Sequence, residues 1–134
     1  MARAAHFGWF FLLLLLVGCT KDEEYVDVQR EQLAAWKEMA DILETVKDET
    51  SMVEAKKALD QRSEKYAALS RKAKALPRPR PEAIERMQEQ KFFVDSAIAR
   101  LRTEAGRVNR LPGGPEFMKH FQSNSQGLST AVQP

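Results

Sequence analysis

The sequence predicts an all-α protein in which three long helices form an up-down-up bundle, followed by a mobile C-terminal tail. Apolar residues recur every three or four positions through three long segments, which is the spacing of one helix face. None of these segments shows the strict alternation of a half-buried strand. Charged residues make up 30% of the chain, and its abundant Ala, Glu, Lys, Leu and Arg lose little rotamer freedom in a helix.

The three predicted helices cover residues 24–47, 52–76 and 82–110, and together they define a bundle over residues 24–111. Each has one apolar face that a neighbouring helix can bury. The faces carry Trp36, Met39 and Leu43 in the first helix, Leu59, Tyr66 and Leu69 in the second, and Ile98, Leu101 and Val108 in the third. Because the connections are short, we expect successive helices to be antiparallel.

The predicted helix boundaries follow from local chemistry. Ser51 followed by Glu54 is a capping-box pattern, in which each side chain satisfies a backbone N–H at the start of a helix. The segment 77–81 contains three prolines and cannot continue a helix, although Pro81 suits the first position of the next one. Residues 112–115, Pro-Gly-Gly-Pro, close the third helix.

The first residues of the chain form an apolar run that is too short to span a membrane. Residues 7–17 are apolar throughout and include five consecutive leucines. A spanning helix needs about 20 apolar residues, whereas the core of a signal peptide needs about 7–15. The run ends in Leu16-Val17-Gly18-Cys19, which resembles the lipobox of bacterial lipoproteins.

That resemblance implies a signal peptide at residues 1–18 and a lipidated tether at residues 19–23. In the family a diacylglyceryl group is attached to the cysteine thiol, here that of Cys19, and the chain is cut just before it. Two or more acyl chains give stable attachment to a membrane. The resemblance therefore implies a lipid-anchored protein of the cell envelope, facing the periplasm or the exterior. Thr20 in place of an Asp after the cysteine slightly favours the outer membrane over the inner one.

The charge balance gives no case for a nucleic-acid partner, but it does include one local basic cluster. Lys and Arg number 21 against 19 Asp and Glu, whereas phosphate-binding proteins show a clear basic excess on one face. The basic cluster lies at the second turn and consists of Arg71, Lys72, Lys74, Arg78 and Arg80. One interpretation is contact with anionic lipid head groups, worth about 1 kcal/mol per basic residue. The favoured alternative is that these residues complement a helix C-terminus and are neutralised by residues 22–24.

No pattern of catalytic or metal-binding residues is visible, so the sequence predicts a protein that is not an enzyme and needs no cofactor. The chain has two histidines: His6, which directly precedes the apolar run at residues 7–17, and His120 in the predicted tail. Cys19 would be consumed by lipidation. Gly113-Gly114 follows a helix and lacks the surrounding residues of a phosphate-binding loop.

Some residues do not fit the pattern of apolar helix faces. A few are polar residues at apolar positions, and others are adjacent aromatic residues that one narrow helix face cannot both bury. Gln32, Arg62 and Lys91 interrupt the faces; we expect their long side chains to reach water, the alternative being that they line a ligand groove. Phe92 and Phe93 are adjacent, so one is a candidate for contact with a partner. In the tail, residues 112–134, a short helix at 116–122 would carry Phe117 and Phe121, which either cover the end of the bundle or contact a partner.

Two classes of function are consistent with these features. The first is a lipid-anchored helical interaction or adaptor module with a protein partner in the envelope. The alternative is a carrier or chaperone on the periplasmic side that binds apolar ligands or segments, which methionine and aromatic side chains suit. Self-association through the long apolar faces stays open.

Overall fold

The computed structural model describes residues 20–126 and 128, and this part of the chain is all-helical. It contains α1 (Thr20–Thr45), α2 (Glu49–Ala75), α3 (Pro81–Gln88), α4 (Lys91–Asn109) and α5 (Gly114–Ser125). The all-α prediction is therefore confirmed, although the described residues form five helices where the sequence predicts three long ones and a short one at 116–122. None of the described helices combines the length and the apolar character that crossing a membrane requires.

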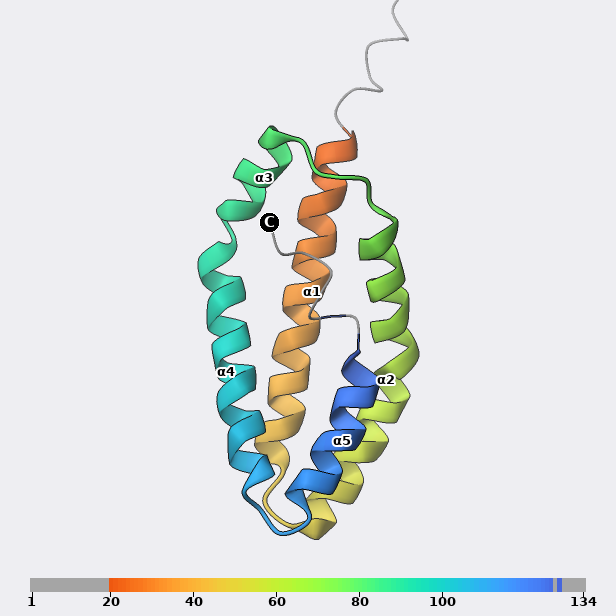
Figure 1. Cartoon of the computed structure of the whole chain (residues 1–134), viewed down its shortest axis with the longest axis vertical. Helices are drawn as coiled ribbons and strands as arrows, with labels where there is room; N and C mark the ends of the chain where they lie inside the picture. The colour runs from red at the N-terminus through yellow and green to blue at the C-terminus, as the bar shows by residue number, and fades with distance from the viewer. Residues whose placement is uncertain (1–19, 127, 129–134) are drawn as a thin grey trace, which may run out of the picture.

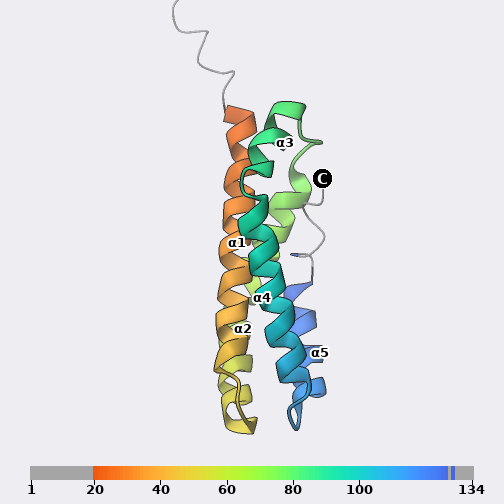
Figure 2. The ribbon, with the colours of Figure 1, turned by 90° about the vertical axis from the view of Figure 1, so that its left-hand side faces the viewer.

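The long helices run up and down the bundle, and α5 fills one half of it. α1 descends, α2 returns beside it, and the chain crosses over the start of α1 before α3 and α4 descend again (Figure 1). α1 packs against α2, α3 and α4, whereas α5 packs against α2 and α4. The side view shows α5 beside the lower part of α4, at the end of the bundle opposite α3 (Figure 2).

The first two helices begin earlier than the sequence predicts. Residues 20–23, assigned to a tether, belong to the first turn of α1. The N-cap of α2 is Asp48 rather than Ser51: its carboxylate accepts the Ser51 N–H at 2.8 Å, and the Ser51 hydroxyl accepts the Asp48 N–H at 2.9 Å. Ser51 thus takes part in a capping box, but as the third helical residue, because Asp48 is also an effective N-cap.

The segment predicted as one helix, 82–110, is two helices separated at residues 89–90. Neither residue is Pro or Gly, and both keep right-handed helical dihedral angles. The Met87 carbonyl accepts a hydrogen bond from the Gln90 N–H at 3.1 Å and another from Gln29 Nε2 of α1 at 3.2 Å. The break is therefore stabilised by a tertiary contact, which the local sequence does not reveal.

The segment predicted as a mobile tail contains α5, which is longer than the short helix expected at 116–122. Gly113 has a φ of 75°, in the left-handed region that favours glycine. A Cβ on Gly114 would lie 2.1 Å from the Val108 carbonyl oxygen, so only glycine allows this close return of the chain. Phe117 and Phe121 are buried at 1% and 6% exposure. Residues 129–134 of the predicted tail lie outside the described residues.

The core consists of two clusters at different levels of the bundle. The main cluster includes Leu43, Leu59, Tyr66, Phe117 and Leu128, and it joins α1, α2, α4 and α5. The second is small: Tyr25 of α1 packs with Ala83 and Met87 of α3. The half-buried Leu76 touches both clusters. The end of the bundle that holds α3 is therefore supported by far fewer buried side chains than the rest.

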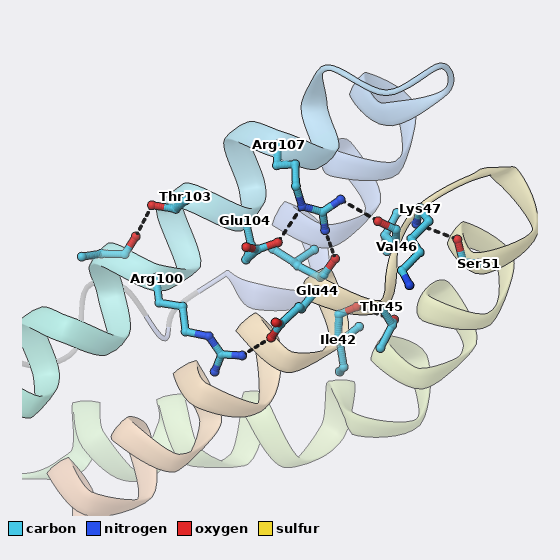
Figure 3. A network of polar contacts seen from close by, with 12 residues as sticks. Ile42, Glu44, Thr45, Val46, Lys47, Ser51, Arg100, Thr103, Glu104 and Arg107 are labelled. Atoms are coloured by element: carbon cyan, nitrogen blue, oxygen red, sulfur yellow. Dashed lines mark hydrogen bonds and ion pairs between the residues drawn. The ribbon is translucent and has the colours of Figure 1, made fainter.

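Arg107 of α4 caps the C-terminal end of α1. Its guanidinium donates to the carbonyl oxygens of Leu43 and Val46, each at 2.7 Å, and to Glu104 at 2.8 Å (Figure 3). The last carbonyl groups of a helix have no partner within the helix. A side chain from α4 thus satisfies the end of α1 and fixes the level at which the two helices meet.

Candidate functional site

A groove lies at the end of the bundle where α1 begins. It lies between α2 on one side and α3 and α4 on the other, with α1 beneath, and its volume is about 520 Å³. The proline-containing segment that leads from α2 to α3 crosses the start of α1 and bounds the groove (Figure 1). We call it the proline-loop groove. Small-molecule sites have volumes of about 300–1,000 Å³.

The floor of the groove is formed by two polar side chains of α1. The Tyr25 hydroxyl donates to the Pro77 carbonyl oxygen at 2.7 Å and so ties the proline segment to α1. Gln29 is 8% exposed, and its Nε2 donates to the Met87 carbonyl. Its Oε1 is buried and accepts no hydrogen bond from the described residues. A buried acceptor without a partner costs about 1–3 kcal/mol, so this oxygen would gain from a donor within the groove.

The walls of the groove are mainly apolar. Ala73 and Leu76 come from α2 and its C-terminal end, and Ile84, Met87, Val94 and Ile98 come from α3 and α4. Leu76, Ile84, Val94 and Ile98 are only half-buried, in contrast to the fully buried side chains of the main cluster. The groove therefore presents apolar surface that the chain itself leaves partly uncovered.

The structure divides the basic cluster predicted at the second turn into two groups. Arg71 pairs with Glu64 at 2.7 Å, Lys72 with Glu31 at 2.7 Å, and Arg80 with Asp22 at 3.4 Å. The hydrogen bond to Glu31 raises the pKa of Lys72, which keeps this pair charged.

Lys74 and Arg78 form the second group, and both line the groove. Neither forms an ion pair with any residue of the described part. Lys91 of α4 also lines the groove but pairs with Asp95 at 2.5 Å. The unneutralised positive charge is thus concentrated on the α2 side of the opening.

The three polar residues that interrupt the apolar faces have different environments. Gln32 is fully buried and both its amide atoms lack a partner among the described residues, so the expectation that it reaches water is wrong. Arg62 donates to Glu38 at 2.6 Å and to the Ala58 carbonyl at 3.0 Å. Lys91 is exposed at the edge of the groove.

Glu38 is the centre of a polar network between α1 and α2. It accepts hydrogen bonds from Arg62, from Lys65 Nζ at 3.1 Å and from the Tyr66 hydroxyl at 3.1 Å. Burial alone would raise the pKa of Glu38, but these three hydrogen bonds outweigh it and hold the pKa below its ordinary value. Burial, together with the negative charge of Glu38, raises the pKa of Tyr66. The network lies away from the groove and joins two helices.

The four candidate aromatic residues also separate into two groups. Phe117 and Phe121 are core residues of α5, so they are not available as a surface for a partner. Phe92 and Phe93 are 75% and 54% exposed, and their rings pack edge to face with centroids 5.8 Å apart. They lie at the start of α4, but neither lines the proline-loop groove.

Among the described residues no cluster of His, Cys, Asp or Glu is arranged to hold a metal ion. His120 instead packs α5 against α2, with its Nε2 2.8 Å from Asp60 Oδ1. The arrangement of the groove suits binding: apolar walls, a buried acceptor on the floor and positive charge on one edge. Sequence reasoning missed Gln29, although Gln29 and Gln32 share a helix face at a spacing of three with buried apolar residues.

Two further facts bear on the identity of the chain. The predicted signal peptide and Cys19 lie outside the described residues. Comparison with known proteins finds no match, whether among protein families, curated protein sequences or solved structures.

Proposed function

We propose that this chain is a lipid-anchored protein of the cell envelope that acts as a helical interaction module, with no catalytic role of its own. The resemblance of Leu16-Val17-Gly18-Cys19 to a lipobox supports the anchor. The start of α1 at Thr20 supports close attachment, because little flexible chain would separate the bundle from lipid on Cys19. By the same resemblance, Thr20 after the cysteine slightly favours the outer membrane.

The observation that carries the proposal is the proline-loop groove. α5 fills the space between α2 and α4 at the far end of the bundle, whereas at the near end the same space is left as a groove. Tyr25 and Gln29 lie about 8 and 14 Å along α1 from its first residue, at 1.5 Å per residue. An anchor at Cys19 would therefore hold this groove close to the membrane surface, where a partner's apolar part could enter it.

A carrier for apolar ligands is the second candidate, and the size of the groove favours it. Its volume of about 520 Å³ falls within the range of small-molecule sites, and its walls are apolar with few polar groups. An adaptor would use the same groove for one partner protein. The adaptor and the carrier have the same lipid anchor and use the same groove. They differ in what the groove binds, which is a partner protein for the adaptor and an apolar ligand for the carrier.

Crosslinking from the groove in living cells tests the proposal. A photoreactive residue in place of Ile84, which is half-buried in the wall, is compared in the native chain and in Cys19→Ser. One dominant envelope protein captured only from the anchored chain is expected for an adaptor, and lipid adducts are expected for a carrier. Equal products from both chains would contradict a role that depends on the anchor. The anchor itself predicts a tryptic peptide, Cys19-Thr20-Lys21, that carries a lipid mass.

A further inference from the structure

The inference concerns the occupant of the proline-loop groove and rests on the carrier form of the proposed function. Its first element is the shape of the apolar strip. Ile84, Val94 and Ile98 place partly uncovered apolar side chains along the α3–α4 wall. The wall runs over two helices: Ile84 lies in α3, and Val94 and Ile98 lie about 6 Å apart along α4, at 1.5 Å per residue. The strip thus continues from one helix to the next, which suits an extended hydrocarbon chain.

The second element is the closed end of the groove. The proline segment crosses the start of α1 (Figure 1), and the 2.7 Å hydrogen bond from Tyr25 to the Pro77 carbonyl holds it there. A partner helix is about 10 Å wide, and it would have to displace this segment to continue past it. A flexible chain that lies along α3 and α4 leaves that hydrogen bond intact. The closed end therefore favours a flexible ligand over a helix.

The third element is the distribution of charge at the opening. Lys74 and Arg78 line the groove without an ion pair to any described residue, while three neighbouring basic residues are each paired with a carboxylate. Lys91 on the opposite wall is balanced by Asp95. Two uncompensated positive charges at one edge of an apolar groove complement a ligand with an anionic head group.

The fourth element is the unpartnered oxygen on the floor. Gln29 is more than nine-tenths buried, lines the groove, and its Oε1 accepts no hydrogen bond from the described residues. Its amide orientation is fixed by the hydrogen bond from Nε2 to the Met87 carbonyl. A donor would satisfy this oxygen, and a hydroxyl group of a polar head is such a donor.

We propose that the proline-loop groove binds a single-chain anionic lipid. The acyl chain lies along Ile84, Val94 and Ile98. The negatively charged head group lies at Lys74 and Arg78, and a head-group hydroxyl donates to Gln29 Oε1. Such a ligand satisfies the apolar strip, the charged edge and the buried acceptor together.

Photolabelling of the full chain in membranes tests the proposal. The chain is reconstituted into phosphatidylcholine vesicles that contain a monoacyl phosphatidylglycerol with a photoreactive group at the end of its chain. The same probe with a phosphocholine head group is the matched control. We expect label on the wall formed by α3 and α4, with about thirtyfold more from the anionic probe, because each of the two basic residues favours an anionic head group by about fivefold.

Two pairs of variants separate the head-group contact from the acyl-chain contact. Lys74→Ser with Arg78→Ser is expected to abolish the preference for the anionic probe, whereas Lys57→Ser with Lys119→Ser, which removes the same charge from exposed positions elsewhere, is not. Ile98→Asn is expected to reduce labelling by both probes several-fold. Its control is Val53→Asn, since Val53 is 68% exposed outside the groove. Helix content by circular dichroism shows that each variant is folded.

Four outcomes would overturn the proposal. The first is equal labelling by the two probes, and the second is label centred on Phe92 and Phe93, which would indicate binding to exposed apolar surface only. The third is labelling that appears only in Cys19→Ser, which would identify the chain's own lipid as the occupant. The fourth is labelling that appears only after residues 129–134 are removed, which would identify that segment as the occupant. The lipid mass on the Cys19 peptide is read from the same digest, so failure of the anchor and failure of the ligand assignment are distinguished.

Discussion

Replacing Arg107 by Ala should destabilise the bundle more than any other change to an arginine on α4. The guanidinium makes two hydrogen bonds of 2.7 Å to the carbonyl oxygens of Leu43 and Val46, and both of these residues are completely buried. When the side chain is removed, the Leu43 carbonyl keeps the hydrogen bond from the Val46 N–H, whereas the Val46 carbonyl loses its side-chain donor. A hydrogen bond that involves a charged group contributes about 1.5–3 kcal/mol.

The Arg107 side chain is 35% exposed, so the lower end of that range applies to each bond. We therefore expect Arg107→Ala to lower the free energy of unfolding by about 3 kcal/mol. For a domain of this size the midpoint of thermal unfolding should fall by about 10–20 °C. The assay is urea and thermal unfolding of the unlipidated chain from Thr20 onward, followed by far-ultraviolet circular dichroism.

Two further variants make this prediction specific. Arg107→Lys should recover only part of the loss, because one ammonium group cannot match the planar fork that reaches two carbonyl oxygens. Arg110→Ala removes an exposed arginine from the end of the same helix and should change stability by no more than about 0.5 kcal/mol. If Arg107→Ala were as stable as Arg110→Ala, the capping of α1 by α4 would not matter for stability and the reasoning would be refuted.

Three other predictions follow from the fold. Gly114→Ala should cost about 2–3 kcal/mol in unfolding experiments, because its Cβ would meet the Val108 carbonyl oxygen at 2.1 Å and the backbone would have to shift; a cost below that of an ordinary surface change would contradict the close approach. Phe117→Ala should cost about 3–5 kcal/mol by the same measurement, since the side chain is 1% exposed in the main cluster, and a loss under 1 kcal/mol would mean that α5 is not part of the core. The pKa of Glu38 is lower in the folded chain than its ordinary value of 4.5. The ionised carboxylate therefore stabilises the fold fully above pH 4.5, and this stabilisation is lost as the pH falls through the folded-state pKa. Glu38→Gln should therefore lose less stability than the native chain as the pH falls below 4.5, as measured by urea unfolding at a series of pH values. An unchanged pH profile would remove Glu38 from the explanation.

Periodicity predicted helix content well and helix packing poorly. The three long apolar faces are visible because the spacing of three and four depends only on the geometry of one helix. The break at residues 89–90 is not visible, because it is stabilised by Gln29, which lies 58 residues away from Met87 in the sequence. Local propensity contains no information about such a contact.

The prediction of a mobile tail was wrong for residues 114–125, which form α5, and the reason is related. Residues 122–127 are polar, and the composition alone indicates a mobile segment. However, Phe117 and Phe121 lie four residues apart, on one helix face, and the space between α2 and α4 accepts them. The sequence shows the apolar pair, but it does not show the space between α2 and α4 that the pair fills. That space exists only once the other helices have packed.

The sequence predicted some of the residues of the candidate site, namely its basic side chains and the apolar face that carries Ile98. Lys74, Arg78 and Lys91 stand out in the sequence, the first two as part of a basic cluster and the third as an interruption of an apolar face. Which basic residues are neutralised depends on partners from other helices, such as Glu31 for Lys72. The floor residue Gln29 lies on the same helix face as Gln32, but that position does not reveal its hydrogen bond to the Met87 carbonyl, because Met87 comes from a distant helix.

The core is divided into a main cluster and a small one, and this division affects how fast a molecule can leave the proline-loop groove. Only Ala83 and Met87 are buried in α3, and they belong to the small cluster with Tyr25. Regions with few buried contacts open at a lower free energy than the whole domain does. We expect amide hydrogens of α3 to exchange with solvent faster than those of the α1–α2 interface. Opening of α3 also exposes the groove, so the lifetime of a bound molecule would be set by the local stability of one short helix.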